Sequence, residues 1–397
     1  MITNKIRNQR LRVNIQHNNN SGSAGIYLHI PFCKTKCTYC DFYMLTNESQ
    51  IDKFVEAICA ESALRKDEIQ EEEVKTIYFG GGTPSRLSTN HFKKIFEALY
   101  LNYKIDSKAE ITVEANPDDL SDEYLKTLSQ LPVNRLSIGI QSFNDEELKF
   151  LSRRHSAQQA ISSVKTAQSH GFNNISVDLM YGLPDQTEEI WKDNLEQVTN
   201  LGVQHLSAYH LIYEEKTRMY NMLKTGKIKP VDEELSTTMF SMLIDWMKRH
   251  DFIQYEISAF GKEGYFSQHH TSYWKKRKSL GLGPAAHSYN GYDRSWNISS
   301  LHRYIKGVES GNLEREAEHL SINEKYNEFI LTGLRTMWGI DLSDMINIFG
   351  EDIYNYCIEN AQPYINAGKL IIQENTLKLT QKGIFISDGI MSDLMRV

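Results

Sequence analysis

The sequence has no long hydrophobic run, little cysteine and no excess of positive charge. None of its apolar stretches approaches the roughly 18 residues that a membrane-spanning helix needs. The formal net charge of −7 disfavours a nucleic-acid-binding surface. Only 5 cysteines occur, an odd number, and no secretory signal precedes them, which disfavours a disulfide framework. We therefore expect a cytoplasmic protein with no membrane span and no nucleic-acid partner.

The remaining composition is that of an ordinary globular chain of two or three domains, with 40% hydrophobic and 24% charged residues among 397. Residues 1–24 differ, because they are basic and polar and end in an Asn/Ser/Gly tract. We expect this stretch to be a disordered or added N-terminal extension. An arm that binds anionic surfaces is the alternative.

Short apolar runs alternate with amphipathic stretches from residue 25 to about 215, which is the βαβ rhythm of a parallel sheet, and the predicted barrel domain is 25–225. The predicted strands are 25–30, 74–81, 110–115, 135–140, 175–182 and 205–211. The predicted helices include 50–66, 88–100, 121–130, 156–169 and 187–200. Six βα units predict an α/β fold with a partial, TIM-like (β/α)6 barrel, whose active-site groups project from the C-terminal ends of the strands.

The rhythm changes after the barrel. Residues 226–310 begin with a linker and a helix over 233–250, then become rich in glycine, histidine and aromatics, and are expected to extend the barrel mouth. Residues 311–397 are mainly helical, with a small hairpin in KLIIQENTLKLTQKG, and predict a winged-helix-like C-terminal domain. This domain has no basic concentration, so a packing role is favoured over DNA binding.

Three cysteines lie close together in HIPFCKTKCTYCDF: Cys33, Cys37 and Cys40. A closed metal site or an ordinary iron–sulfur cluster uses four protein ligands, so three thiolates leave one coordination position open to a substrate or cofactor. The other two, Cys59 and Cys357, lie in helical runs and are expected to be small buried hydrophobes. A zinc knuckle completed by a nearby histidine, His29, is the alternative, although the spacing is unusual for zinc.

The C-x3-C-x2-C spacing, with an aromatic residue just before the third cysteine, resembles the signature of the radical S-adenosylmethionine superfamily. The preceding YLHIPFC is similar to the branch that contains oxygen-independent coproporphyrinogen III dehydrogenase and the HemW-type haem chaperones. The resemblance implies a 4Fe-4S cluster on the three cysteines, with S-adenosylmethionine bound at its open iron.

Further candidate cofactor residues follow the strands. The glycines of FGGGTPS let the backbone approach a ligand closely, although a tight turn would need them too. Polar residues lie near the ends of later strands, where burial without a hydrogen-bond partner is costly. An arginine among them can bind a carboxylate through two hydrogen bonds. A structural salt bridge or helix cap is the alternative for each of these residues. The resemblance makes these positions, with two tyrosines and an isoleucine, S-adenosylmethionine contacts: Tyr27, Tyr39, Gly81, Gly82, Thr83, Glu114, Gln141, Arg153, Asp178 and Ile212. They would serve one or two molecules of the cofactor.

Two functions are consistent with the resemblance. One is an enzyme that uses a radical to remove hydrogen from the propionates of coproporphyrinogen III. The other is a chaperone that binds haem and delivers it to an acceptor protein. The dehydrogenase pattern has another cysteine two residues after the third, whereas here Asp41 and Phe42 follow Cys40. The dehydrogenase also has a structured segment before its cysteines, whereas here most of the preceding residues belong to the polar stretch 1–24. Both differences favour the chaperone.

A histidine-rich motif, HHTSYW, begins at His269. It resembles the H-N-x-x-Y-W motif of the chaperones, with His270 standing where asparagine is usual. A neutral imidazole is a common axial ligand of haem iron, so His269 is the predicted ligand and His287 a weaker candidate. The histidines could instead serve only in packing. The resemblance also implies a reducing donor such as a flavodoxin or ferredoxin, and it leaves a homodimer open.

Overall fold

The computed structural model describes residues 22–396, and one large twisted sheet forms its centre. Within these residues the sheet has 12 strands in the order β12-β11-β10-β9-β1-β2-β3-β4-β5-β6-β8-β7. The six consecutive strands at its centre are parallel. They are β1 (Ser23–Ile30), β2 (Glu73–Gly81), β3 (Ile105–Ala115), β4 (Arg135–Gln141), β5 (Ile175–Tyr181) and β6 (His205–His210). The predicted six-stranded partial barrel is confirmed.

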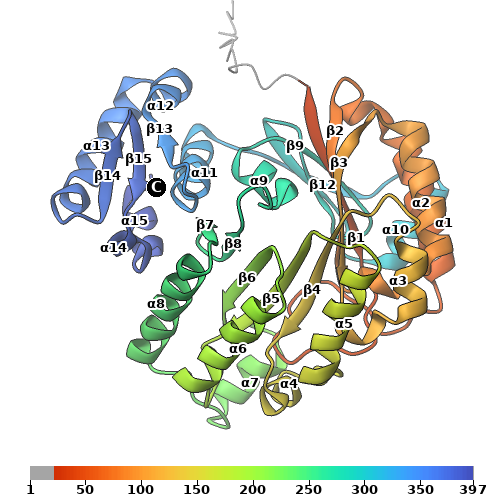
Figure 1. Cartoon of the computed structure of the whole chain (residues 1–397). Coiled ribbons are helices and arrows are strands. Elements are labelled where there is room, and N and C mark those ends of the chain that lie inside the picture. The colour runs from red at the N-terminus through yellow and green to blue at the C-terminus, as the bar shows by residue number, and fades with distance from the viewer. Residues whose placement is uncertain (1–21, 397) are drawn as a thin grey trace, which may run out of the picture.

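Helices cover the outer face of this sheet (Figure 1). They are α1 (Ile51–Leu64), α2 (Thr89–Asn102), α3 (Asp122–Leu128), α4 (Asp145–Phe150), α5 (Ala157–Ser169) and α6 (Glu188–Asn200). Several begin at a side-chain cap, since Ser88, Ser121, Ser156 and Thr187 each accept a hydrogen bond from a backbone N–H of the first turn. These caps explain why the predicted helix starts lie within about a residue of the observed ones.

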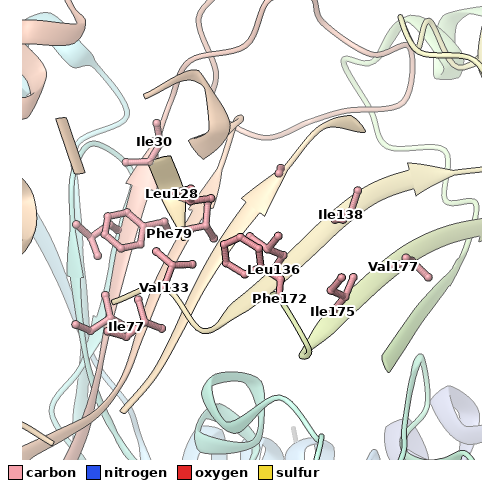
Figure 2. Close-up of a cluster of buried hydrophobic side chains, with 14 of the residues drawn as sticks. Ile30, Ile77, Phe79, Leu128, Val133, Leu136, Ile138, Phe172, Ile175 and Val177 are labelled. Carbon is pink, nitrogen blue, oxygen red and sulfur yellow. The ribbon is translucent and has the colours of Figure 1, made fainter. Parts of the chain in front are cut away.

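The two faces of the barrel strands differ in chemistry. The outward side chains are apolar and pack under the helices; Figure 2 shows part of this cluster, with Ile77 and Phe79 of β2, Leu136 of β4 and Val177 of β5 among the labelled side chains. Inward positions alternate with these and are mostly polar. They include Thr76, Tyr78, Glu110, Thr112, Glu114, Arg135, Ser137, Ser176, Asp178, His205 and Ser207. A barrel interior is usually filled by branched apolar side chains, so this polar lining indicates a binding site.

The segment 226–310 adds strands to both edges of the sheet. β7 (Ile253–Glu256) and β8 (Ala259–Gly261) continue beyond β6, whereas β9 (Lys278–Leu282) pairs in parallel with β1. β10 (His287–Tyr289), β11 (Asp293–Asn297) and β12 (Arg315–His319) follow β9. The helix α7 (Arg218–Lys224) precedes this segment, which contains the helices α8 (Glu233–Arg249), α9 (Gln268–Trp274) and α10 (Leu301–Glu309). Only the helix over 233–250 had been predicted here.

The C-terminal part is mainly helical and has its own hydrophobic core. Its elements are α11 (Ile322–Leu334), β13 (Ile340–Asp341), α12 (Leu342–Phe349), α13 (Glu351–Asn366), β14 (Leu370–Gln373), β15 (Thr376–Leu379), α14 (Gln381–Ile384) and α15 (Ser387–Leu394). The predicted hairpin is β14–β15, and its two turn residues, Glu374 and Asn375, both have positive φ, as a tight hairpin requires. The winged-helix topology and the domain bounds stay predictions.

The predicted N-terminal extension, 1–24, lies mostly outside the described residues. Ser23 and Ala24 belong to β1, where they pair with Glu73 and Val74, so the first strand starts two residues earlier than predicted. No helix in the described part of the chain is long and apolar enough to cross a bilayer.

Candidate cofactor site

The three clustered cysteines lie in the loop that follows β1. The backbone N–H of Cys33 donates to the carbonyl of Leu45 at 2.9 Å, and that of Thr38 donates to Leu151 at 3.3 Å, so the loop is fixed at both ends. All three cysteines are partly exposed free thiols, and they line one cavity of about 530 Å3. This cavity opens at the C-terminal ends of the barrel strands, as predicted for the fold.

The arrangement of the thiols favours an iron–sulfur cluster over a single zinc ion. Within residues 22–396, no three His, Cys, Asp or Glu side chains converge on a point suited to one metal ion. The His29 ring uses both nitrogens elsewhere, with the Tyr27 hydroxyl at 3.1 Å and the Tyr43 carbonyl at 2.9 Å. In a four-iron cluster each thiolate binds a different iron, so its ligands need not meet at one point. The other cysteines differ, since Cys357 is fully buried, as expected, but Cys59 only partly.

Burial favours the protonated form of two of the thiols, Cys33 and Cys40. Burial raises the pKa of the Cys33 thiol to about 11, with Thr83 opposing the rise, and burial also raises the pKa of Cys40. A metal cluster supplies positive charge, which is what such thiols need to become ligands. The donor set therefore fits the group that the cysteine spacing predicts.

Arg153 links the cysteine loop to the barrel. Its Nη1 donates to the Cys37 sulfur at 3.6 Å, and its Nη2 donates to the Asn116 side chain and the Gly139 carbonyl, each at 2.5 Å. Its buried Nε has no hydrogen-bond partner in the described structure. A buried charged donor without a partner is costly, so this atom fits a ligand in the cavity.

The glycines at the end of β2 allow close packing as well as ligand access. A Cβ on Gly81, which has a φ of +106°, would lie 2.6 Å from the His29 ring, and one on Gly82 would lie 2.8 Å from the Ile30 carbonyl oxygen. Both glycines line the cavity, as does the buried Thr83. The Thr83 hydroxyl lies 3.2 Å from the Cys33 sulfur. The glycines therefore have two roles: they let β2 pack closely against β1, and they leave room for the predicted approach of a ligand to the backbone.

Two carboxylates stand on the cavity floor. Glu114 of β3 accepts a hydrogen bond from the Tyr78 hydroxyl at 2.7 Å, and Asp178 of β5 accepts from Ser137 at 3.4 Å. Burial raises the pKa of Glu114 to about 7, and the Asp178 charge adds to the rise; burial likewise raises the pKa of Asp178 to about 6. A cationic ligand would relieve both effects, which suits the sulfonium and ammonium groups of S-adenosylmethionine.

The other predicted contacts are not all on the cavity wall. Tyr39, Gln141 and Ile212 line it, and Gln141 does so with a φ of 73° at the end of β4. Tyr27 is not among the lining residues; its ring stacks on that of Tyr78 with centroids 6.2 Å apart. Tyr27 therefore lies behind the wall and supports Tyr78.

The two histidines of HHTSYW have different environments. His269 is 1% exposed; its Nδ1 bonds to the Thr76 hydroxyl and its Nε2 to the Tyr273 hydroxyl, both at 2.7 Å. His270 is partly exposed, lines the cavity, and has no ring hydrogen bond to another described residue. The geometry therefore favours His270 over the predicted His269 as an iron ligand. His287 is not among the lining residues and stacks on Trp296.

Comparison with known proteins identifies the family. Residues 27–198 match the model of the radical SAM superfamily, and residues 320–386 match the HemN C-terminal domain. A protein of Bacillus subtilis named heme chaperone HemW is 34% identical over 367 residues, covering 92% of this chain and 97% of the relative. The chain belongs to the HemW family. The heme chaperone HemW of Lactococcus lactis is 33% identical, over 93% of this chain and 96% of that one.

The radical SAM match and the HemW relatives confirm the predicted superfamily and the predicted HemW branch. A solved structure described as Escherichia coli coproporphyrinogen III oxidase (HemN) has a TM-score of 0.82 and 21% identity, with 94% of this chain and 90% of that chain covered. That likeness shows the fold alone. In this HemW-family chain, Asp41 and Phe42 line the cavity, and Phe42 is 65% exposed.

Sequence reasoning missed several lining residues. Asn116 lies two positions after Glu114, and Met180 lies two positions after Asp178. Because side chains on one face of a strand recur every second residue, the predicted Glu114 and Asp178 could have led to these two neighbours. Tyr78 also lines the cavity, but it lies three positions before Gly81, so this period does not lead to it. His210 also lines the cavity, where its Nε2 lies 2.7 Å from the Ser236 hydroxyl.

Proposed function

We propose that this HemW-family protein binds haem, a 4Fe-4S cluster and S-adenosylmethionine, and delivers the haem to an acceptor protein. The observation that carries the proposal is one cavity lined both by the three clustered cysteines and by His270. The Bacillus and Lactococcus relatives are named heme chaperones, which supports haem as the cargo.

Cys33, Cys37 and Cys40 would hold the cluster. When bound, such a cluster supplies single-electron redox chemistry and one iron position open to a ligand. The Arg153 guanidinium donates to the Cys37 sulfur, so it would stabilise that ligand as a thiolate.

S-Adenosylmethionine would bind beside the cluster. Gly81, Gly82 and Thr83 leave room for close backbone approach, and Glu114 and Asp178 offer negative charge to its cationic groups. Gln141, Tyr39 and Ile212 complete this part of the wall, and the free Nε of Arg153 is available to an acceptor atom. Tyr27 would act indirectly, by holding Tyr78.

Haem would bind with His270 as an axial ligand. Burial lowers the pKa of His270 to about 4, with the Arg135 charge contributing, so the imidazole is neutral near pH 7 and its lone pair is available to iron. Phe42 and Ile212, each 65% exposed, give the cavity apolar walls that suit a porphyrin.

The partners follow from this role. The acceptor would be a protein with an empty haem site, and a flavodoxin or ferredoxin would reduce the cluster. A homodimer stays a prediction.

Haem titration of the full-length protein tests the proposal. After anaerobic reconstitution, ferric haem should give a saturable Soret band, and coproporphyrinogen III should not be converted to protoporphyrinogen IX under reducing conditions. A surface variant, His302→Ala on α10, should bind haem like the parent. Conversion of coproporphyrinogen III, or rescue of a strain that lacks its coproporphyrinogen dehydrogenase, would contradict the proposal.

A further inference from the structure

The candidate haem ligand and the candidate S-adenosylmethionine residues share one cavity floor. We infer that haem and S-adenosylmethionine exclude each other from this cavity, so that binding of one releases the other. The inference rests on the proposed function and adds regulation to the same site.

His270 is two contacts away from a carboxylate of the S-adenosylmethionine set. Its ring centroid lies 5.1 Å from that of Tyr78, and the Tyr78 hydroxyl donates to Glu114 at 2.7 Å. A porphyrin is a flat ring that extends several ångströms from its iron within its own plane. With its iron bound to His270 it would lie beside Tyr78 and Glu114.

The second carboxylate lies on the same floor. Ser137 of β4 is the register neighbour of Glu114, and its hydroxyl donates to Asp178 at 3.4 Å. Tyr78, Glu114 and Asp178 thus form a continuous row across β2 to β5, with His270 at one end. A ligand that pairs its cationic groups with the two carboxylates occupies the space above this row.

The volume of the cavity is typical of a site for one ligand. A cavity of about 530 Å3 lies in the lower half of the range of about 300–1,000 Å3 that is typical of pockets for a single small molecule or cofactor. A haem on His270 and an S-adenosylmethionine on the two carboxylates would both need the space above the same row of side chains.

Two other places in the described part of the chain suit haem poorly. His269 has both ring nitrogens in hydrogen bonds behind the wall, so it offers no second coordination point. Another hollow among the described residues, on α8, is lined by Glu233, Glu234, Thr237 and Thr238 and has neither an imidazole nor an apolar wall. Haem bound through His270 would therefore lie in the S-adenosylmethionine cavity.

Exclusion has a quantitative signature. Binding that is strictly competitive raises the apparent dissociation constant of haem by the factor 1 + [L]/Kd of the competitor. S-Adenosylmethionine at ten times its own Kd should therefore weaken haem binding about 11-fold, and the effect should grow linearly without a plateau. Linkage requires haem to weaken S-adenosylmethionine binding in the same way.

The experiment is an anaerobic haem titration of the reconstituted full-length protein at several S-adenosylmethionine concentrations, followed by the Soret band. Calorimetry measures the Kd of S-adenosylmethionine separately. Glu114→Gln loses one carboxylate but keeps His270, so it should bind S-adenosylmethionine more weakly. The S-adenosylmethionine concentration that raises the apparent haem Kd by a given factor should increase in proportion to the S-adenosylmethionine Kd of this variant. Asp178→Asn serves the same purpose if the first variant fails to fold.

The outcomes separate this inference from the proposed function. A haem Kd that stays constant, or reaches a plateau, while calorimetry shows S-adenosylmethionine bound would mean a ternary complex. That result overturns the exclusion but leaves the haem-chaperone proposal standing. A protein that binds no haem at all would overturn both.

Discussion

Arg153 gives the sharpest test of the S-adenosylmethionine site. Its two terminal nitrogens are held by Cys37, Asn116 and Gly139, and its buried Nε has no partner in the described structure. Arg153→Lys keeps a positive charge but removes the planar fork and this Nε. The loss of one charged hydrogen bond costs about 1.5–3 kcal/mol, so S-adenosylmethionine should bind about 10- to 150-fold more weakly.

Anaerobic calorimetry on the reconstituted protein measures this change. Iron content and thermal unfolding should be recorded for each sample, because Arg153 also contacts the cysteine loop. Arg303→Ala is the matched control: this arginine is 56% exposed on α10, where it pairs with Glu314, and its loss should leave the affinity unchanged. If Arg153→Lys with intact iron binds S-adenosylmethionine as tightly as the parent, the assigned site is wrong.

Three further predictions concern the cluster, the carboxylates and the fold. Reconstituted protein should contain about four irons per chain and a broad brown absorbance that Cys37→Ala loses, whereas uptake of zinc without iron would contradict the cluster. Burial raises the pKa of Glu114 to about 7 and that of Asp178 to about 6, so both carboxyl groups become ionised as the pH rises. The affinity for S-adenosylmethionine, measured by calorimetry, should therefore increase between pH 5 and pH 8. Glu114→Gln should remove the upper part of that increase, and an unchanged pH profile in this variant would contradict the role of Glu114. Gly82→Ala places a Cβ 2.8 Å from the Ile30 carbonyl oxygen and should destabilise the protein by about 1–3 kcal/mol in thermal unfolding. Gly389→Ala is the control, because there is open space around that position, and it should not destabilise the protein. Equal stability of the two variants would contradict the close packing of Gly82 against β1.

The central strands could be predicted closely from the sequence. The strand predicted at 135–140 is observed as Arg135–Gln141, and that at 205–211 as His205–His210. Each of these strands has an apolar outer face that is buried under helices. The helices next to them begin at Ser or Thr caps, which mark where each helix starts. These signals are local, so one sequence is enough to reveal them.

The edge strands could not be predicted in the same way. β8 and β10 have only three residues each, and β9 is paired with β1, more than 200 positions earlier in the chain. A strand this short has too few residues for a period of two to be recognised. Its existence depends on a partner that folding brings from far away.

For the site, the sequence could not show which of the neighbouring histidines, His269 and His270, faces the cavity. Successive residues on a helix point about 100° apart, and here His270 lines the cavity whereas His269 does not. The choice is made by long-range contacts: Glu110 accepts hydrogen bonds from the backbone N–H groups of Gln268 and His269, and Thr76 bonds to the His269 ring. The motif predicted the place of the ligand but not which histidine faces the cavity.

The Soret band of three single variants tests the central claim most directly. Full-length parent, His270→Ala, His269→Ala and His302→Ala are reconstituted anaerobically and titrated with ferric haem. We expect His270→Ala to lose or shift the band, His302→Ala to match the parent, and correctly folded His269→Ala to keep the parent's band position. A parent-like spectrum in His270→Ala, with the band lost in His269→Ala, would contradict haem ligation from the cavity wall.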